Sequence, residues 1–187
     1  MAAGLTLVLG GVRSGKSAFA EGLARELHQP TLYVATGTAS DEDMAERIRR
    51  HQARRPAHWV TLEEPLDLAG RLGVVLAMAD PPGVVVIDSL DVWVGNLLLK
   101  HEAKAPEAVT ALTVLAAGRL LEVCQSSSTV FFLVSSEVGH SLVPPNQLGR
   151  HFQDLLGEVN QKVAAAASLV YLVIAGIPVE IKGIAAF

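Results

Sequence analysis

Cysteine and long apolar runs are scarce in this sequence, and each shortage excludes a class of protein. Cys124 is the single cysteine of 187 residues, so the chain can form neither an intramolecular disulfide nor a Cys-x-x-Cys metal site. Its place in the apolar stretch RLLEVC predicts a small buried side chain. No uninterrupted apolar run reaches the length of about 18 residues that a transmembrane helix needs. The N-terminal MAAGLTLVLGG lacks the basic start of a signal peptide, so we expect a cytoplasmic protein.

The composition predicts one globular domain with a large core. Half of the residues are apolar, 18% are charged, and the net charge is −4. An acidic chain is a poor electrostatic partner for nucleic acid, although a local basic patch remains compatible with it. The length fits a single domain over residues 1–187.

Short β-branched runs alternate with longer helical patterns along the chain. The pattern predicts strands at 5–10, 31–35, 83–88, 129–135, 169–176 and 178–182, and helices near 15–28, 40–55, 65–79, 105–125 and 146–167. Most of the runs are continuously apolar, which is typical of parallel strands covered on both faces. We therefore predict an α/β fold of the doubly wound, P-loop NTPase type: a mostly parallel sheet with helices on both faces. The last two runs are too close for a helical crossover and predict an antiparallel edge strand.

A phosphate-binding loop follows the first predicted strand. The stretch GGVRSGKS at 10–17 satisfies G-x-x-x-x-G-K-[ST] in the strand–turn–helix context that this motif requires. Glycines allow the backbone N–H groups to surround phosphates, and the following helix directs its positive end at them. Lys16 is expected to reach the β- and γ-phosphates, and Ser17 to bind Mg²⁺. The sequence therefore predicts a nucleoside triphosphate site.

A second acidic element supports this site. VVVIDSL at 84–90 is an apolar strand that ends in Asp88, where this fold places a carboxylate for Mg²⁺ or its water. The alternative is that Asp88 caps the following helix, which DSLD also permits.

The basic stretch RIRRHQARRPAHW at 47–59 has two interpretations. Arginines at the end of a helix that starts with acids complement the helix dipole without any further function. Helical phase, however, places His51 on the apolar side between Arg47 and Arg55, where neighbouring cations favour the neutral imidazole that a nucleophile needs. A packed structural histidine and a catalytic one both fit this pattern. A nucleic-acid site fits poorly because Trp59 is the only aromatic residue nearby.

The motifs together resemble one family, the bifunctional adenosylcobinamide kinase/adenosylcobinamide-phosphate guanylyltransferases of cobalamin biosynthesis. The resemblance is carried by LVLGGVRSGKSAFAE (7–21), by YVATGTASDEDMAERIRRHQARRPAHWVTLEEP (33–65), by VVVIDSLDVWVGNLL (84–98) and by the stretch from VSSEVGH to PVEIK (134–182). It implies phosphorylation of adenosylcobinamide, followed by transfer of GMP from GTP to the new phosphate with release of pyrophosphate. It further implies GTP, with ATP as an alternative donor, and Mg²⁺ as ligands, and a homotrimer. Neither nucleic acid nor membrane insertion is expected.

The resemblance also implies roles for particular residues. His51 corresponds to the histidine that carries GMP, and Lys16 is the second catalytic residue. The metal is expected at Ser17 and Asp88. The nucleotide-binding positions are Gly10, Gly11, Val12, Arg13, Ser14, Gly15, Lys16, Ser17, Gly37, Thr38, Gln52, Ala53, Arg54, Arg55, Glu63 and Asp88.

Other residues are open to two interpretations. Glu137 and His140, in the loop 135–145 after a predicted strand, fit either a substrate contact or ordinary loop structure. His58, His151 and Trp93 are better explained as structural. Two other functions stay open on the residues alone: a simple P-loop kinase of a small metabolite, and a nucleotide-dependent switch or nucleic-acid-binding ATPase.

Overall fold

The computed structural model of the chain describes residues 4–38, 42, 46, 49, 52 and 55–184. The strands are β1 (Leu5–Gly10), β2 (Thr31–Ala35), β3 (Val60–Glu63), β4 (Val84–Asp88), β5 (Val130–Ser136), β6 (Leu169–Ile174) and β7 (Ile177–Glu180). The helices over the described ranges are α1 (Lys16–Glu26), α3 (Leu68–Leu76), α4 (Leu90–Lys100), α5 (Pro106–Gln125) and α6 (Gln147–Ala166).

The strands form one seven-stranded sheet in the order β3-β2-β4-β5-β1-β6-β7. All neighbouring strands are parallel except β6 and β7, which form the predicted antiparallel pair. Because parallel strands end at one edge of a sheet, the segments that follow β1, β2, β4 and β5 meet there, where ligands bind in folds of this type. The strand β5 lies between β4 and β1, so it separates the acid-bearing strand from the phosphate-loop strand.

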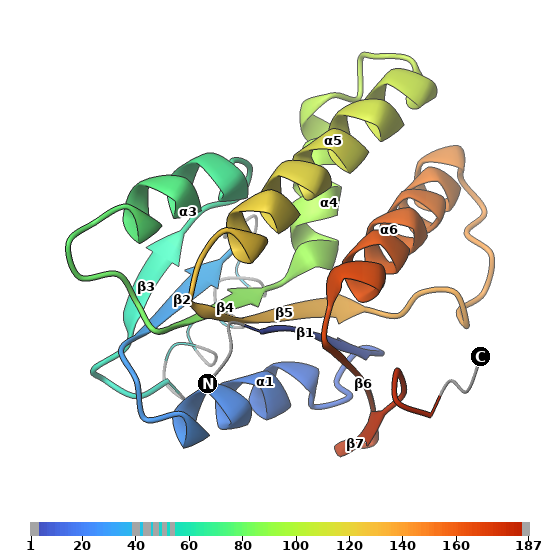
Figure 1. Cartoon of the computed structure of the whole chain (residues 1–187). Helices are drawn as coiled ribbons and strands as arrows, with labels where there is room; N and C mark the ends of the chain where they lie inside the picture. Colours follow the sequence, from blue (N-terminus) through green and yellow to red (C-terminus); the bar gives the residue numbers. More distant parts are fainter. Residues whose placement is uncertain are drawn as a thin grey trace.

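Helices cover both faces of the sheet, as predicted. Figure 1 shows α3, α4, α5 and α6 on one face and α1 on the other. The alternation of side chains along each strand explains why both faces are apolar. Leu7 packs in a core cluster with Trp93 of α4, whereas the next residue, Val8, packs with Ala20 of α1. The continuous apolar runs in the sequence therefore report burial on both sides of the sheet.

Two elements were not predicted from the sequence. The strand β3 has only four residues, VTLE, and three of them are exposed, so it lacks the apolar run that marks the other strands. The helix α4 begins directly after Asp88 and Ser89 and contains β-branched residues and Trp93, which obscure its helical pattern. Of the helix predicted at 40–55, the structure describes Glu42, Glu46, Arg49 and Gln52, which are helical, and Arg55, which lies in a bend.

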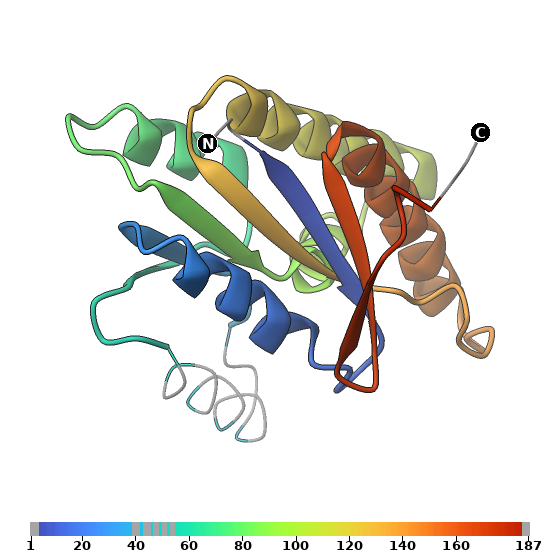
Figure 2. The same cartoon turned by 60° about the horizontal axis from the view of Figure 1, so that its bottom comes forward.

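The β6–β7 hairpin turns through Ala175 and Gly176, which have φ angles of +50° and +82°. A two-residue hairpin turn needs positive φ at both central residues if its twist is to match the right-handed twist of the two strands. Figure 2 shows this turn beside the loop that joins β1 to α1. Within the described ranges, no helix combines the length and apolarity needed to cross a bilayer.

Candidate active site

The phosphate loop joins β1 to α1 in a conformation that its glycines allow. Gly15 precedes α1 with a φ of +96°, and Arg13 has a φ of +57°. A side chain at Gly10 would place its Cβ 2.4 Å from Ser14 Oγ and 2.7 Å from the Val173 carbonyl oxygen, so only glycine fits there. The first N–H groups of α1 have no acceptor within the helix and face this loop. The structure thus confirms the strand–turn–helix context predicted for GGVRSGKS.

Hydrogen bonds hold the loop closed on itself and on the neighbouring hairpin. The Ser14 N–H and Lys16 Nζ each donate to the Gly11 carbonyl at 3.2 Å. The Gly176 N–H donates to the Ser14 carbonyl at 2.8 Å, which joins the loop to the β6–β7 turn. Lys16 is buried, with 8% of its surface exposed, and Ser17 is half-buried. The ammonium is therefore held inside the loop, where phosphate oxygens would be its strongest partners.

Asp88 ends β4 and is bound by a buried tyrosine. The Tyr33 hydroxyl donates to Asp88 Oδ2 at 2.5 Å. Burial, the negative charge of Asp88 and this hydrogen bond raise the pKa of Tyr33 well above its ordinary value, so the hydroxyl remains a donor at neutral pH. The helix α4 takes Ser89 as its N-cap residue, not Asp88. The alternative interpretation of Asp88 as the cap is therefore wrong.

The segment RPAHW at 55–59, which ends the basic stretch, packs on Tyr33. The Arg55 guanidinium carbon lies 3.5 Å from the centroid of the Tyr33 ring, and Arg55 Nη1 donates to Thr61 Oγ1 at 3.3 Å. The Trp59 ring stacks on the Tyr33 ring, with the two ring centroids 6.4 Å apart and an interplanar angle of 28°. Arg55 and Trp59 thus anchor the end of the basic stretch against β2, next to the strand that carries Asp88.

The turn after YVAT is fixed from two sides. Thr36 Oγ1 accepts from the Ser89 N–H and donates to the Ser89 carbonyl, both at 2.8 Å. Asn96 Nδ2 of α4 donates to the carbonyls of Thr36, at 2.9 Å, and Pro65, at 3.1 Å. Gly37 and Thr38 follow directly, so the structure brings these predicted positions to the same edge as Asp88.

The remaining predicted nucleotide positions have different outcomes. Gln52 is exposed and helical, and Arg55 packs on Tyr33 as described above. Glu63 ends β3, exposed and opposite Ala35 of β2. His51, Ala53 and Arg54 lie outside the described residues, so the predicted setting of His51 between Arg47 and Arg55 stays a prediction.

The end of β5 contributes polar residues that the sequence did not single out. Ser136 Oγ donates to Asp91 Oδ2 at 2.9 Å. Asn160 Nδ2 of α6 donates to the Ser136 carbonyl at 3.0 Å, and Asn160 Oδ1 accepts from Ser135 Oγ at 2.7 Å. Asp91 follows Asp88 by three residues, and this second acid in an apolar stretch was the signal available in the sequence. Tyr33, the one aromatic residue of its strand TLYVA, was another.

Two other predicted positions have structural surroundings. His151 Nε2 and Thr110 Oγ1 share a hydrogen bond of 3.0 Å that joins α6 to α5, which agrees with the structural role expected of His151. Glu137 Oε1 accepts from the Gly139 N–H at 2.6 Å, and the Glu137 N–H donates to the Gly10 carbonyl. His140 and His58 are exposed.

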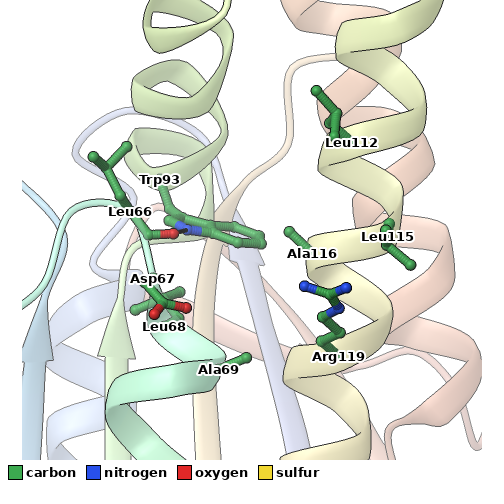
Figure 3. Close-up of a pocket in the computed structure, with 9 residues that line it drawn as sticks. All are labelled: Leu66, Asp67, Leu68, Ala69, Trp93, Leu112, Leu115, Ala116 and Arg119. Atoms are coloured by element: carbon green, nitrogen blue, oxygen red, sulfur yellow. Dashed lines mark hydrogen bonds between the residues drawn. The ribbon is translucent and has the colours of Figure 1, made fainter.

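A small cavity lies on the opposite face of the sheet from α1. Figure 3 shows Trp93 of α4 facing Leu112, Leu115, Ala116 and Arg119 of α5 across it, with the start of α3 beneath. Its volume of about 120 Å³ is below the several hundred Å³ typical of small-molecule sites. The cavity is therefore too small for a nucleotide. In the described part of the chain, no three His, Cys, Asp or Glu side chains gather in a way that could hold a metal ion.

The phosphate loop, the acid-bearing strand and the strand order define a P-loop nucleotide-binding protein. A model of the family described as cobinamide kinase/cobinamide phosphate guanyltransferase matches residues 6–181. The bifunctional adenosylcobalamin biosynthesis protein CobP of Pseudomonas aeruginosa is 39% identical over 177 residues, covering 95% of this chain and 96% of that protein. The bifunctional adenosylcobalamin biosynthesis protein CobU of Escherichia coli K12 is 39% identical over 184 residues, covering 95% and 99%. The chain therefore belongs to the cobinamide kinase/cobinamide phosphate guanyltransferase family.

Membership in this family confirms the resemblance stated above and makes the chain a nucleotide-dependent kinase and guanylyltransferase. The simple kinase and the nucleic-acid-binding ATPase that the residues left open lose their support.

Proposed function

We propose that the chain phosphorylates adenosylcobinamide and then transfers GMP from GTP to adenosylcobinamide phosphate, releasing pyrophosphate. The observation that carries the proposal is the phosphate loop at the same edge of the sheet as Asp88, in a chain whose relatives are bifunctional adenosylcobalamin biosynthesis proteins. Cys124 is a free, buried thiol, as is usual for proteins of reducing compartments, and this supports a cytoplasmic location.

The two transfers need attack at different phosphorus atoms. A kinase breaks the bond to the γ-phosphorus, whereas guanylyl transfer requires attack on the α-phosphorus. A loop that grips the β- and γ-phosphates suits both, because it holds the transferred group in one case and the pyrophosphate leaving group in the other. Lys16, buried in the loop, is the cation placed to stabilise charge on these phosphates.

The nucleophile for the α-phosphorus must come from outside the phosphate loop. We propose His51, four residues before Arg55, as the group that forms the guanylylated intermediate. The support comes from Arg55, which lies on the face of the Tyr33 ring, because the hydroxyl of that tyrosine binds Asp88 at the nucleotide edge of the sheet. A histidine-bound GMP is reactive enough to pass to the corrinoid phosphate.

Ser17 and Asp88 are suitable ligands for Mg²⁺. A hydroxyl and a carboxylate are oxygen ligands of the kind that Mg²⁺ takes, and this ion completes its shell with water and substrate phosphates. Ser17 lies in the first turn of α1, and Tyr33 fixes one oxygen of Asp88. The bound ion would neutralise charge on the phosphate groups.

We also propose a homotrimer, as the family resemblance implies. Large apolar side chains exposed on α3, in the turn after it, and on α4 and α5 support self-association: Val74, Met78, Leu99, Leu112 and Leu115. Sedimentation equilibrium would give the mass of three chains, and a monomer mass would contradict the proposal.

A labelling experiment tests the intermediate. GTP labelled at the α-phosphate should leave an acid-labile, base-stable adduct on the protein, and His51→Ala should abolish it. His58→Ala is the matched control, because His58 is exposed beyond Pro56, and it should form the adduct at the wild-type level. Formation of the adduct by His51→Ala at that level would contradict the assignment. A parallel assay with adenosylcobinamide, GTP and Mg²⁺ should yield both pyrophosphate and a guanylylated corrinoid.

A further inference from the structure

The phosphate loop has an open backbone and a buried cation. Gly11, Val12, Arg13 and Gly15 are exposed, so that ligands in solution can reach the loop. Lys16, by contrast, is 8% exposed, and among the described residues it is the one buried lysine or arginine. Gly15, the N-cap residue of α1, has no side chain that could accept from the first N–H groups of the helix, and anions are the partners that such groups favour.

The loop is held in a single geometry. The Ser14 N–H and Lys16 Nζ both bind the Gly11 carbonyl, and the Ser14 carbonyl accepts from the Gly176 N–H of the β6–β7 turn. A Cβ at Gly15 would lie 3.4 Å from the Cα of Gly176, so the hairpin is in close contact with the loop. A site that is ordered before its ligand arrives offers the same geometry to every phosphate group that enters it.

The direction in which pyrophosphate leaves follows from this site. In the first half of the proposed GMP transfer, the loop holds the β- and γ-phosphates of GTP, and pyrophosphate departs from there. Entering and leaving groups lie roughly in line, on opposite sides of the phosphorus under attack. The side chain that accepts GMP, proposed above as His51, therefore bonds to the α-phosphorus on the side that faces away from the loop.

The same rule fixes the approach of the second substrate. The phosphate of adenosylcobinamide phosphate must attack the α-phosphorus opposite to the side chain that carries GMP. That is the side from which pyrophosphate left, and it faces the loop. The requirement holds for any side chain that carries GMP, because it depends only on two in-line displacements at one phosphorus atom.

We propose that the phosphate loop, after it has released pyrophosphate, binds the phosphate of adenosylcobinamide phosphate and directs it at the bound GMP. An oxygen of this phosphate forms a bond to the α-phosphorus, the bond from the α-phosphorus to the carrier nitrogen breaks, and that nitrogen recovers the electron pair. The accepting phosphate is already ionised at neutral pH. Lys16 and the N–H groups of the loop offset the repulsion between the two anions. This second role of the loop rests on the proposed function, because it requires a guanylylated intermediate.

A competition experiment on the unmodified wild-type protein tests the shared site. Equilibrium dialysis, followed by the absorbance of the corrinoid, gives the Kd of adenosylcobinamide phosphate and of adenosylcobinamide with and without pyrophosphate. At pyrophosphate concentrations that displace GTP, the apparent Kd of adenosylcobinamide phosphate should rise in proportion to pyrophosphate. The Kd of adenosylcobinamide, which lacks the phosphate, should not change. An unchanged Kd for both corrinoids, or an equal rise for both, would overturn the proposal.

The substitution Lys16→Ala gives a second measurement. Because hydrogen bonds to charged groups are strong, we expect the affinity for adenosylcobinamide phosphate to fall by about 10-fold or more. The affinity for adenosylcobinamide should stay at the wild-type value, which also shows that the variant is folded. Lys104→Ala is the matched control, since Lys104 is exposed between α4 and α5, and it should change neither affinity. Equal losses for the two corrinoids with Lys16→Ala would contradict the shared site.

Failure of this proposal can be told apart from failure of the proposed function. A wild-type protein that forms the guanylyl adduct and converts both corrinoids, yet binds pyrophosphate and adenosylcobinamide phosphate at the same time, would overturn the shared site alone. A wild-type protein that carries out neither transfer would overturn the proposed function, and the shared site with it.

Discussion

The Arg55 guanidinium lies 3.5 Å from the centroid of the Tyr33 ring, whose hydroxyl donates to Asp88. Three residues from separate segments of the chain therefore form one contiguous unit, which meets the nucleotide edge of the sheet at Asp88. The cation is on the ring face, where the π electrons attract it, and the hydroxyl is at the ring edge, where it can hold a carboxylate. The basic stretch and the acid-bearing strand are thus joined through a single aromatic side chain.

Removal of the Tyr33 hydroxyl should weaken both stability and catalysis. Tyr33→Phe keeps the ring between Arg55 and Trp59 but leaves Asp88 without this donor. Because hydrogen bonds to charged groups contribute more than neutral ones, we expect the free energy of unfolding to fall by about 1–2 kcal/mol and both transfers to slow. Tyr171→Phe is the control, since the described contact of Tyr171 is edge-on to Phe19. Urea unfolding and steady-state rates measure the difference, and equal effects of the two variants would contradict the role of the hydroxyl.

Truncation of Arg55 should cost more than truncation of an exposed arginine. Arg55→Ala removes the stacking on Tyr33 and the contact with Thr61, and we expect a loss of about 1–2 kcal/mol in the free energy of unfolding. Arg49→Ala removes an exposed ion pair with Glu46 at 2.8 Å, which is worth about 0.5 kcal/mol or less. Chemical denaturation of the two variants side by side gives the comparison. A smaller loss for Arg55→Ala than for Arg49→Ala would contradict this prediction.

Two glycines close together in the chain should respond in opposite ways to alanine. Gly15 has a φ of +96°, where a Cβ costs about 1–2 kcal/mol, so Gly15→Ala should destabilise the protein and weaken GTP binding. Gly22 lies within α1, and a Cβ there would meet no atom within 4 Å. Gly22→Ala should therefore stabilise the protein by up to about 1 kcal/mol. Thermal unfolding and GTP titration of both variants test the contrast, which similar shifts would refute.

Cys124 should lower stability at alkaline pH and resist thiol reagents in the folded protein. Burial raises the pKa of its thiol from 9.0 to about 12. The unfolded chain thus loses the thiol proton first, and the contribution that is complete below about pH 9 is lost as the pH rises toward about 12. The slope approaches about 1.4 kcal/mol per pH unit. Cys124→Ala should lack this part of the stability loss at alkaline pH. The raised pKa of Tyr33 affects the stability of both proteins equally, so it does not disturb the comparison. Parallel slopes between pH 9 and 11, or rapid thiol labelling of the folded protein, would contradict the prediction.

The sequence predicted the elements that depend on local pattern. The phosphate loop and Asp88 lie in motifs of a few consecutive residues, and the buried strands are continuous apolar runs, so both could be found without a structure. The strand β3 could not, because its four residues are mostly exposed and join the sheet only by pairing with β2. Propensity carries little information about such a short edge strand.

The contacts that organise the site depend on distant parts of the chain. Tyr33 and Arg55 are brought together because the segment after β2 returns to the sheet at β3, and Asp91 meets Ser136 because β5 inserts between β4 and β1. No spacing rule relates these residues. The sequence shows which residues can form a nucleotide site, but the strand order decides which polar side chains lie together at the nucleotide edge of the sheet.

The central position of β1 also has a consequence for the order in which the chain acquires its structure. Leu5 is paired with Phe131, and Thr6 with Leu169, so β1 gains its neighbours only after residues more than 120 positions later in the sequence have been made. Pairings that close such long loops are slow to form, and an apolar strand that waits for them is exposed to association with other chains. The nucleotide loop, which is bound through Ser14 to the last hairpin, is thus completed only at the end of folding.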